Sequence, residues 1–530
     1  MSYTWLVPLP VMIPLFAAGL ALALYRRPRL QQVISVVALM LMVVFSAWLM
    51  AVVDAGPIVV NSGGWAAPVG VALVGDRLSA LMLTVSSTVL LSVMVYSIGQ
   101  GISDGNHKAP VSIYHPTYLA LAAGVSNAFL AGDLFSIYVG FEMLLVASYV
   151  LLTLGGTFER IRAGAIYVVV GLLSSMIFLT ALAMIHAATG TMNLAQLSVR
   201  LAEIDPDVAL VLQILLLLGF GIKAAIFPLS SWLPDSYPTA PAPVTAVFAG
   251  LLTKVGVYAI MRTQTLLFPS GRLDDALMWL ALATMIIGIL GAVTQNDIKR
   301  LLSFTLVSHI GYMVFGIALG SKIGLGAAIF YVAHHITVQT TLFLIVGLIE
   351  RRGGTTSLTR LGGLAKVAPG LAVLFFIPAM NLAGIPPFSG FLGKVGLLEA
   401  GAAQDRPLAW VLVIGSVVAS LLTLYAIVKA WNKAFWQPGT DDVPDVKLPR
   451  IMVGPAAALL LVTLAITVFA GPLYDYANRA ATTMMDSRNY VDAVLSPEGR
   501  GDGHSTDKDG PGRVDESNLR DADAEEGVVS

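Results

Sequence analysis

Long apolar runs separated by short polar segments fill the chain from its first residues to about residue 473. A run of about 18 or more apolar residues can cross a hydrocarbon core of about 30 Å as a helix. The pattern therefore predicts an all-α polytopic membrane protein with about fourteen transmembrane helices. The predicted spans are 3–25, 32–53, 78–98, 112–131, 134–154, 164–187, 208–234, 242–267, 276–294, 300–319, 323–350, 369–401, 407–435 and 451–473.

Proline interrupts two of these spans, the seventh and the twelfth. Pro228 lies in the former, and Pro386 and Pro387 lie in the latter. Because proline removes a backbone donor and clashes with the preceding turn, both helices are predicted to be broken. Around the breaks, residues 228–235 (PLSSWLPD) match residues 387–394 (PFSGFLGK).

This match indicates an internal repeat. The two motifs are offset by five predicted spans, and because five is an odd number, equivalent helices cross the membrane in opposite directions. We therefore expect two inverted five-helix repeats, covering about 112–267 and 276–435. Inverted repeats with discontinuous helices are typical of secondary transporters, whose ion sites lie at the breaks.

The loops differ in charge, and this difference orients the chain. Most Lys and Arg residues follow odd-numbered spans, as Arg26, Arg27 and Lys299 do. By the positive-inside rule these loops face the cytoplasm, so both termini lie outside a bacterial plasma membrane. Residues 1–474 then form the transmembrane domain, and the polar residues 475–530 are expected to be a disordered tail. Residues 192–204 are expected to form a short amphipathic helix at the interface.

Composition excludes several classes of function. Hydrophobic residues make up 57% of the 530 residues and charged residues only 12%, against about 25% charged residues in soluble domains. The net charge of −1 argues against a nucleic-acid partner, and the absence of cysteine excludes disulfides and cysteine-ligated iron–sulfur clusters. Glycine-rich phosphate loops and metal-spaced histidine sets are missing, so we expect neither a cofactor, nor a metal, nor a stand-alone enzyme.

Four charged residues are predicted to lie deep inside the spans, and near the middle of a bilayer such a residue costs about 2.5–3.5 kcal/mol on insertion scales. They are Glu142, Lys223, Lys254 and Lys394. Burial favours a neutral lysine and a nearby carboxylate favours a charged one, so a lysine held between these effects can exchange protons. We expect Glu142 to be the partner of Lys223. The alternative is a buried pair that only fixes helix packing.

Histidines within spans are further candidates. His334 is the strongest of them, while His335 and His309 are secondary, because histidine relays protons near neutral pH. Packing through hydrogen bonds is the alternative for all three. Asp235 ends the first broken span and is a secondary candidate at the cytoplasmic mouth, where simple loop capping explains it almost as well.

The stretch 223–262, KAAIFPLSSWLPDSYPTAPAPVTAVFAGLLTKVGVYAIMR, closely resembles the antiporter-like subunits shared by Mrp-type cation/proton antiporters and respiratory complex I. GDRLSALM at 75–82, FEMLLVASYVLL around Glu142 and GIPPFSGFLGK at 384–394 fit the same superfamily. The resemblance covers about residues 1–475. Within the superfamily, the chain is most similar to the D subunits of bacterial multisubunit Na⁺/H⁺ (Mrp) antiporters.

The resemblance implies a hydrophilic axis at mid-membrane through Glu142, Lys223, Lys254 and Lys394. It also implies about six other membrane subunits as partners, including the large A subunit, with H⁺ and Na⁺ as the transported ions. Related subunits often have a lysine where this chain has Gln339, so the central relay is expected to use His334 or water.

The sequence therefore predicts a proton-translocating subunit of a monovalent cation/proton antiporter. The first alternative is a proton-pumping membrane subunit of complex I or of a membrane-bound hydrogenase. The second is a structural membrane scaffold in which the buried charges have no transport role.

Overall fold

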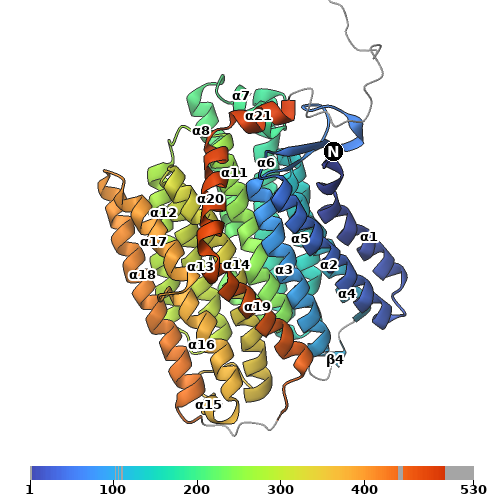
Figure 1. The fold of residues 1–530 in the computed structure, drawn as a ribbon, viewed down its shortest axis with the longest axis vertical. Helices are drawn as coiled ribbons and strands as arrows, with labels where there is room; N and C mark the ends of the chain where they lie inside the picture. The colour runs from blue at the N-terminus through green and yellow to red at the C-terminus, as the bar shows by residue number, and fades with distance from the viewer. Residues whose placement is uncertain (1–2, 102, 105–106, 109–110, 440–445, 496–530) are drawn as a thin grey trace, which may run out of the picture.

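The computed structural model describes residues 3–101, 103–104, 107–108, 111–439 and 446–495. These residues form a bundle of helices that run roughly parallel to one axis (Figure 1). One end of the bundle, here called the α21 end, carries α7 (Leu194–Arg200) and α21 (Arg488–Leu495). The opposite end, the α15 end, carries α15 (Leu364–Val367) and strand β4 (His107–Lys108).

The remaining helices follow one another along the chain. In the first half they are α1 (Leu9–Ala23), α2 (Pro28–Val52), α3 (Arg77–Gln100), α4 (Val111–Leu130), α5 (Leu134–Thr153), α6 (Phe158–Thr189), α8 (Pro206–Ala224), α9 (Trp232–Ser236), α10 (Ala242–Val247) and α11 (Thr253–Leu266). In the second half they are α12 (Asp274–Thr294), α13 (Ile298–Ala318), α14 (Lys322–Gly353), α16 (Pro369–Ala383), α17 (Ser389–Ala402), α18 (Pro407–Trp431), α19 (Arg450–Val468) and α20 (Ala470–Met485).

Shorter elements complete the fold. Strands β1 (Ile58–Asn61) and β2 (Ala72–Gly75) pair antiparallel, and β3 (Ser103–Asp104) pairs antiparallel with β4. Single 3₁₀ turns are η1 (Thr4–Leu6), η2 (Ser62–Gly64) and η3 (Tyr237–Thr239), while η4 (Phe248–Leu252) and η5 (Asn432–Trp436) are π-helical turns. The segment η4 joins α10 to α11 in one continuous helix.

In the described part of the chain, eleven helices are long and apolar enough to cross a membrane. They are α2, α3, α5, α6, α8, α10 with α11, α12, α13, α14, α18 with η5, and α19. The predicted helical membrane bundle is therefore confirmed. Its centre is α14, which is buried along its whole apolar stretch and packs against α3, α10, α13, α16, α17, α19 and α20.

Both predicted helix breaks are present, and their backbones are alike. A residue in the left-handed region follows each interrupted helix, Ala225 (φ 58°) after α8 and Gly384 (φ 85°) after α16. The same type of hydrogen bond then closes each turn. These bonds run from Ile226 N to Gly221 O (3.0 Å) and from Ile385 N to Met380 O (3.2 Å).

A second structural feature recurs 164 positions apart. Asp133 caps the start of α5 and Asp297 caps the start of α13, and each lies opposite one residue of a later loop, Asn193 or Ser357. The paired backbone hydrogen bonds are Leu134 N to Met192 O (3.0 Å) with Leu194 N to Gly132 O (2.9 Å), and Ile298 N to Thr356 O (3.0 Å) with Leu358 N to Asn296 O (2.7 Å). The two halves thus share their long-range connections as well as their breaks.

The C-terminal region differs from the sequence expectation. Residues 475–495, expected to belong to a disordered tail, form most of α20 and all of α21. Buried positions spaced by four residues, such as Tyr476, Ala480 and Met484, explain this, because they give α20 one apolar face. The rest of the expected tail, 496–530, lies outside the described residues. The expected interfacial helix at 192–204 is α7, only seven residues long.

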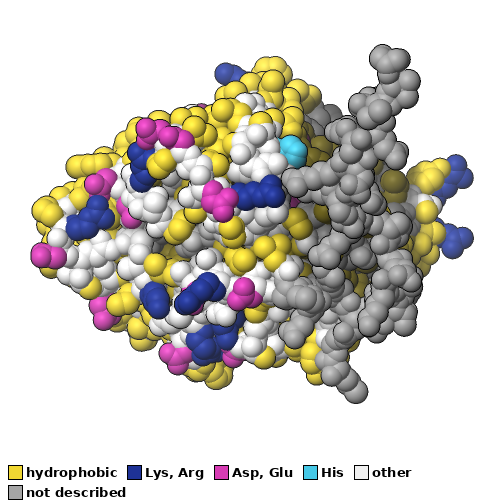
Figure 2. All heavy atoms as spheres, turned by 90° about the horizontal axis from the view of Figure 1, so that it is seen from above, with side chains coloured by type: hydrophobic (Ala, Val, Ile, Leu, Met, Phe, Trp, Pro, Cys, Tyr) yellow, Lys and Arg dark blue, Asp and Glu magenta, His cyan; other side chains and the backbone are white. Residues whose placement is uncertain are grey.

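Ion pairs join helix ends at the α21 end, where Figure 2 shows basic and acidic side chains close together. Asp54, after α2, binds Arg77 of α3 (2.8 Å) and Arg479 of α20 (3.1 Å). The Arg77 hydrogen bond outweighs the weak desolvation and holds the pKa of Asp54 below its ordinary value. This carboxylate therefore fastens α20 to the ends of α2 and α3.

Close packing of α12 against α13 depends on Gly288. A Cβ at this position would lie 2.5 Å from the backbone nitrogen of Ser308, whereas a Cβ at Gly454 of α19 would meet nothing within 4 Å. We expect Gly288→Ala to destabilise the protein by about 1–3 kcal/mol through overpacking. Gly454→Ala should be neutral or stabilising by up to about 1 kcal/mol, because alanine is the better helix former. Thermal unfolding of the purified variants would measure both, and equal shifts would contradict the packing argument.

Candidate functional site

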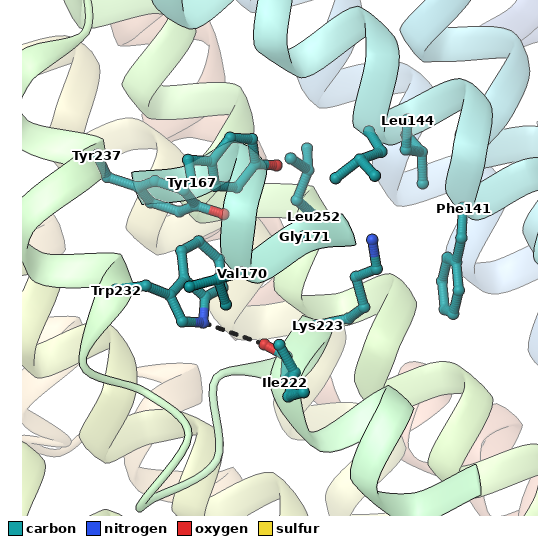
Figure 3. Close-up of a pocket in the computed structure, with 11 residues that line it drawn as sticks. Phe141, Leu144, Tyr167, Val170, Gly171, Ile222, Lys223, Trp232, Tyr237 and Leu252 are labelled. Atoms are coloured by element: carbon teal, nitrogen blue, oxygen red, sulfur yellow. Dashed lines mark hydrogen bonds between the residues drawn. The ribbon is translucent and has the colours of Figure 1, made fainter. Parts of the chain in front are cut away.

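Lys223 lies at the end of α8, beside the first break. Its Nζ is buried and has no hydrogen-bond partner in the described part of the structure. The ring centroid of Phe141 lies 6.0 Å from this nitrogen. Beside it is a cavity of about 30 Å³, lined by residues that include Tyr167, Trp232 and Tyr237 (Figure 3). This volume has room for about two water molecules, which would solvate the ammonium.

Glu142, on α5, is half-buried and accepts a hydrogen bond from Ser175 Oγ of α6. No ion pair joins Glu142 to Lys223 among the described residues, so the expected partnership is not a direct contact in this structure. The neighbouring residue Phe141 contacts the lysine instead. Any influence of the carboxylate on Lys223 is therefore electrostatic and acts across the space between α5 and α8.

Lys254 is completely buried near the start of α11. Its Nζ donates a hydrogen bond of 2.6 Å to the carbonyl oxygen of Ala249 in the π-helical turn η4. This turn also packs against α14, since a Cβ on Gly250 would lie 2.1 Å from Thr340 Oγ1. π-Helical turns inside α-helices are frequent at functional sites. Here the turn places a backbone dipole where the buried ammonium needs one.

Lys394, on α17, is 5% exposed and lies just after the second break. Its Nζ donates to the carbonyl oxygens of Ala383 (3.0 Å) and Leu382 (3.5 Å) at the end of α16. Since the last carbonyls of a helix have no partner within that helix, the break supplies acceptors for the charge. The ammonium also lies 4.9 Å from the ring centroid of Tyr312 on α13.

Three buried histidines lie between the lysines, on α13 and α14. The rings of His309 and His335 are 5.1 Å apart, and the ring of Tyr331 lies 6.0 Å from His309 and 5.5 Å from His334. Tyr331 OH bonds His309 Nδ1 at 2.6 Å, and Ser389 Oγ bonds His334 Nδ1 at 2.9 Å. The structure thus brings the three predicted histidines into one group, here called the histidine cluster.

Several nitrogens of the histidine cluster have no protein partner among the described residues. They are His309 Nε2, His334 Nε2 and both ring nitrogens of His335. Gln339, one turn after His335 on α14, is completely buried and donates to the carbonyl of Leu302 at 2.8 Å. The position where related subunits often carry a lysine therefore holds a neutral amide fixed to the backbone.

Asp235 is the predicted residue that the structure places away from the buried groups. It forms an exposed ion pair with Arg300 at 2.9 Å, and more than half of the Asp235 side chain is exposed. No group of three or more metal-ligating residues occurs in the described ranges.

Sequence reasoning missed the hydroxyl and amide partners of these groups. Ser175, Ser389 and Tyr331 each bond a predicted site residue, and Asn381 Oδ1 accepts the N–H of Gly390 (2.8 Å) beside the second break. Polar residues inside apolar spans were the available signal. They are common in membrane helices, however, so the pattern alone does not select these four.

Lysine, histidine, tyrosine and serine groups lie inside the described part of an apolar bundle, and each is of a chemical type that can exchange a proton. Such buried ionisable groups define the class of ion-translocating membrane proteins. The chain belongs to the NADH:quinone oxidoreductase/Mrp antiporter transmembrane family, which matches residues 131–423.

Relatives and solved structures match almost the whole chain. The D subunit of the Na⁺/H⁺ antiporter of Alkalihalophilus pseudofirmus is 38% identical over 496 residues, covering 92% of this chain and 99% of that protein. A chain in the structure of the Mrp complex from Dietzia sp. DQ12-45-1b has a TM-score of 0.86 and 34% identity, covering 93% of this chain and 100% of its own length. A chain of the membrane-bound sulfane sulfur reductase, an archaeal respiratory membrane complex, has a TM-score of 0.84 and 25% identity, with the same coverage.

Trp232 fixes the first break, because its Nε1 donates to the carbonyl of Ile222 at 3.2 Å (Figure 3). We expect Trp232→Phe to lower the free energy of unfolding by about 1 kcal/mol through loss of this bond. Trp279→Phe is the matched control, since Trp279 is 57% exposed on α12. Thermal unfolding of the two purified variants would test this, and an equal loss in both would refute a specific role for Trp232.

Proposed function

We propose that this chain is a proton-translocating subunit of a multisubunit monovalent cation (Na⁺)/proton antiporter. It would be part of a secondary transporter and not an enzyme, and it would work with other membrane subunits, including the large A subunit. The observation that carries the proposal is the set of buried lysines and histidines in a chain 38% identical to an antiporter D subunit over nearly its whole length.

The proposed proton path runs along the bundle through Lys223, Lys254, His334 and Lys394, with His335 and His309 beside it. Two features support it. Each lysine lies beside a helix break or a π-helical turn, and the histidine cluster has ring nitrogens without a protein partner in the described part of the chain. Water in the cavity beside Lys223 would connect that lysine to the path.

Glu142 would control the first lysine and link it electrostatically to a neighbouring subunit. Its half-buried position supports this role, because a carboxylate near the side of the bundle can be reached by a charge on another chain. The proton motive force would then drive Na⁺ outward elsewhere in the complex or at a shared interface.

We also propose fourteen membrane spans and two inverted repeats, with units near 112–267 and 276–435. The matching backbone turns at the two breaks support this, as do the matching connections at the starts of α5 and α13. In this arrangement the α21 end faces the outside of a bacterial plasma membrane. The excess of basic loops expected at the α15 end supports that orientation.

A redox-driven proton pump is the second candidate. The likeness to a chain of the sulfane sulfur reductase complex favours it, because that assembly is a respiratory complex. The identity of 25% is lower than the 34% shared with the Mrp complex chain, which supports the antiporter assignment.

Loss of the Lys394 ammonium should interrupt the path. In everted vesicles that contain the complete complex, Na⁺-dependent dequenching of a pH-sensitive dye should disappear in Lys394→Ala and persist in Lys322→Ala. Lys322 is the matched control, because it is exposed at the start of α14. Assembly of both variants would be checked by co-purification of the other subunits.

The outcomes separate the candidate functions. Antiport retained in an assembled Lys394→Ala complex would exclude Lys394 from the proton path. No Na⁺ response from the wild-type complex, together with a proton gradient formed on adding a redox substrate, would favour the redox-driven pump. Joint loss of assembly and activity in Lys394→Ala would instead support a structural role for this lysine.

The orientation is testable because the chain contains no cysteine. Single cysteines at the exposed positions Ser270, between α11 and α12, and Thr359, after α14, would lie on opposite ends of the bundle. In intact cells a membrane-impermeant maleimide should label Ser270→Cys and should label Thr359→Cys only after permeabilisation. The reverse pattern would invert the proposed topology.

A further inference from the structure

A buried ion pair lies at the α21 end, above Lys254 on the same helix. Arg262 of α11 contacts Asp76 at 2.6 Å between NH1 and Oδ2, and the two side chains are only 6% and 15% exposed. Asp76 is also the N-cap of α3, where its Oδ1 accepts the backbone N–H of Ser79 at 2.9 Å. The pair therefore joins the end of α11 rigidly to the start of α3.

Tyr258 lies between this pair and Lys254. The residues 254, 258 and 262 are spaced by four, so they lie along one face of α11, and the Cα atoms of the outer two are about 12 Å apart. Tyr258 OH donates to the carbonyl oxygen of Phe129 at 2.6 Å and accepts from Arg262 NH2 at 3.1 Å. A line of polar groups thus leads from Lys254 towards the α21 end.

The direction of these hydrogen bonds blocks proton transfer along that line. The guanidinium donates to both of its neighbours and, unlike a histidine or a hydroxyl, has no lone pair that accepts a proton. Lys254 itself points away from Tyr258, because its ammonium bonds Ala249 towards the start of the helix. An arginine at such a place is a known kind of electrostatic barrier to protons and cations in membrane pores.

α21 covers the pair from outside. Tyr490 is 6% exposed, and its ring centroid lies 5.4 Å from the guanidinium carbon of Arg262. A small cavity of about 30 Å³ lies beside the pair, lined by groups that include Asp76, Arg262, Ser487 and Tyr490. α21 also packs against α7, α20 and β1, so several elements hold the cover in place.

The charge of the pair persists at physiological pH. Burial alone would raise the pKa of Asp76, but Arg262 and the hydrogen bonds from Ser79 hold this pKa below its ordinary value. The carboxylate therefore stays ionised as long as the pH remains above the normal range for aspartate. It loses its contribution only when the pH falls through that lowered pKa.

We propose that the Arg262–Asp76 pair and α21 together form a seal that prevents protons on Lys254 from escaping to the α21 end. The seal keeps protons on the path towards the histidine cluster and Lys394, and so it preserves coupling to cation transport. This inference rests on the proposed proton path. It adds a function for α21, which covers the pair, and for α20, against which α21 packs.

A leak assay without Na⁺ tests the seal separately from antiport. Proteoliposomes with the complete complex would receive an imposed pH gradient, and its decay would be followed with a trapped fluorescent pH indicator. The double variant Asp76→Asn/Arg262→Gln removes both charges and avoids leaving one of them buried without its partner. It should speed the decay several-fold. Adding Lys254→Ala to this variant should restore the wild-type rate, because the leak starts at that lysine.

Matched variants define the controls. Arg272→Gln removes an exposed arginine from the same end, where it pairs with Asp207, and should leave the leak unchanged. Tyr490→Ala opens the cover and should leak, whereas Tyr490→Phe keeps the ring over Arg262 and should not. The comparison of Tyr490→Ala with Tyr490→Phe tests the proposed seal if the double variant does not assemble.

The seal would be overturned if an assembled double variant or Tyr490→Ala complex leaked no faster than Arg272→Gln. It would also be overturned if the leak persisted in the Lys254→Ala background, which would indicate general damage to the bundle. A wild-type complex without Na⁺-driven antiport would refute the proposed function instead, and the leak comparison would still report on the barrier.

Discussion

The cost of taking a lysine ammonium out of water governs the interior of this protein. An apolar helix has no free acceptor, because its carbonyls are already bonded within the helix. The structure meets this need by interrupting helices where charges lie. Lys394 bonds the carbonyls freed at the end of α16, and Lys254 bonds a carbonyl of the π-helical turn η4. Lys223 lies beside the other break, next to a cavity that admits water. Without the second break Lys394 would lose its carbonyl acceptors, and without η4 Lys254 would lose the acceptor at Ala249.

The two breaks have the same backbone turn, but the lysine precedes the break in α8 and follows the break after α16. In the motif alignment, Lys394 corresponds to Asp235 and Leu382 corresponds to Lys223. Lys394 reaches back across its break to the carbonyls of Leu382 and Ala383, whereas Lys223 precedes its own break. Each break thus has an ammonium near corresponding backbone positions. Asp235 is consequently free to form a surface ion pair with Arg300, which explains why it lies apart from the other candidates.

Sequence reasoning predicted a helical membrane bundle and its family, and both predictions are confirmed. Both predicted breaks are also present in the structure. Sequence reasoning also selected Lys223, Lys254, Lys394 and His334, whose roles remain predictions although the structure places all of them inside the bundle. It was less successful in predicting which residues bond to these side chains. Glu142 was predicted to be the partner of Lys223. Among the described residues it forms no ion pair with this lysine, and it accepts a hydrogen bond from Ser175 on α6. Residues 475–495, which form most of α20 and all of α21, were predicted to belong to a disordered tail, because their polar composition hid the apolar face that packs on the bundle.

Hydrophobic runs, prolines and buried charges are local properties, so the sequence by itself determined that this is a helical membrane protein with broken helices and costly internal lysines. The contacts between side chains on different helices are not a local property of the sequence. The meeting of His309 with His335 joins α13 to α14, and the meeting of Arg262 with Asp76 joins α11 to α3. Such contacts depend on the rotation and crossing of whole helices, which packing over many residues sets together. Only the tertiary structure could therefore decide which groups face one another and which carbonyls receive each charge.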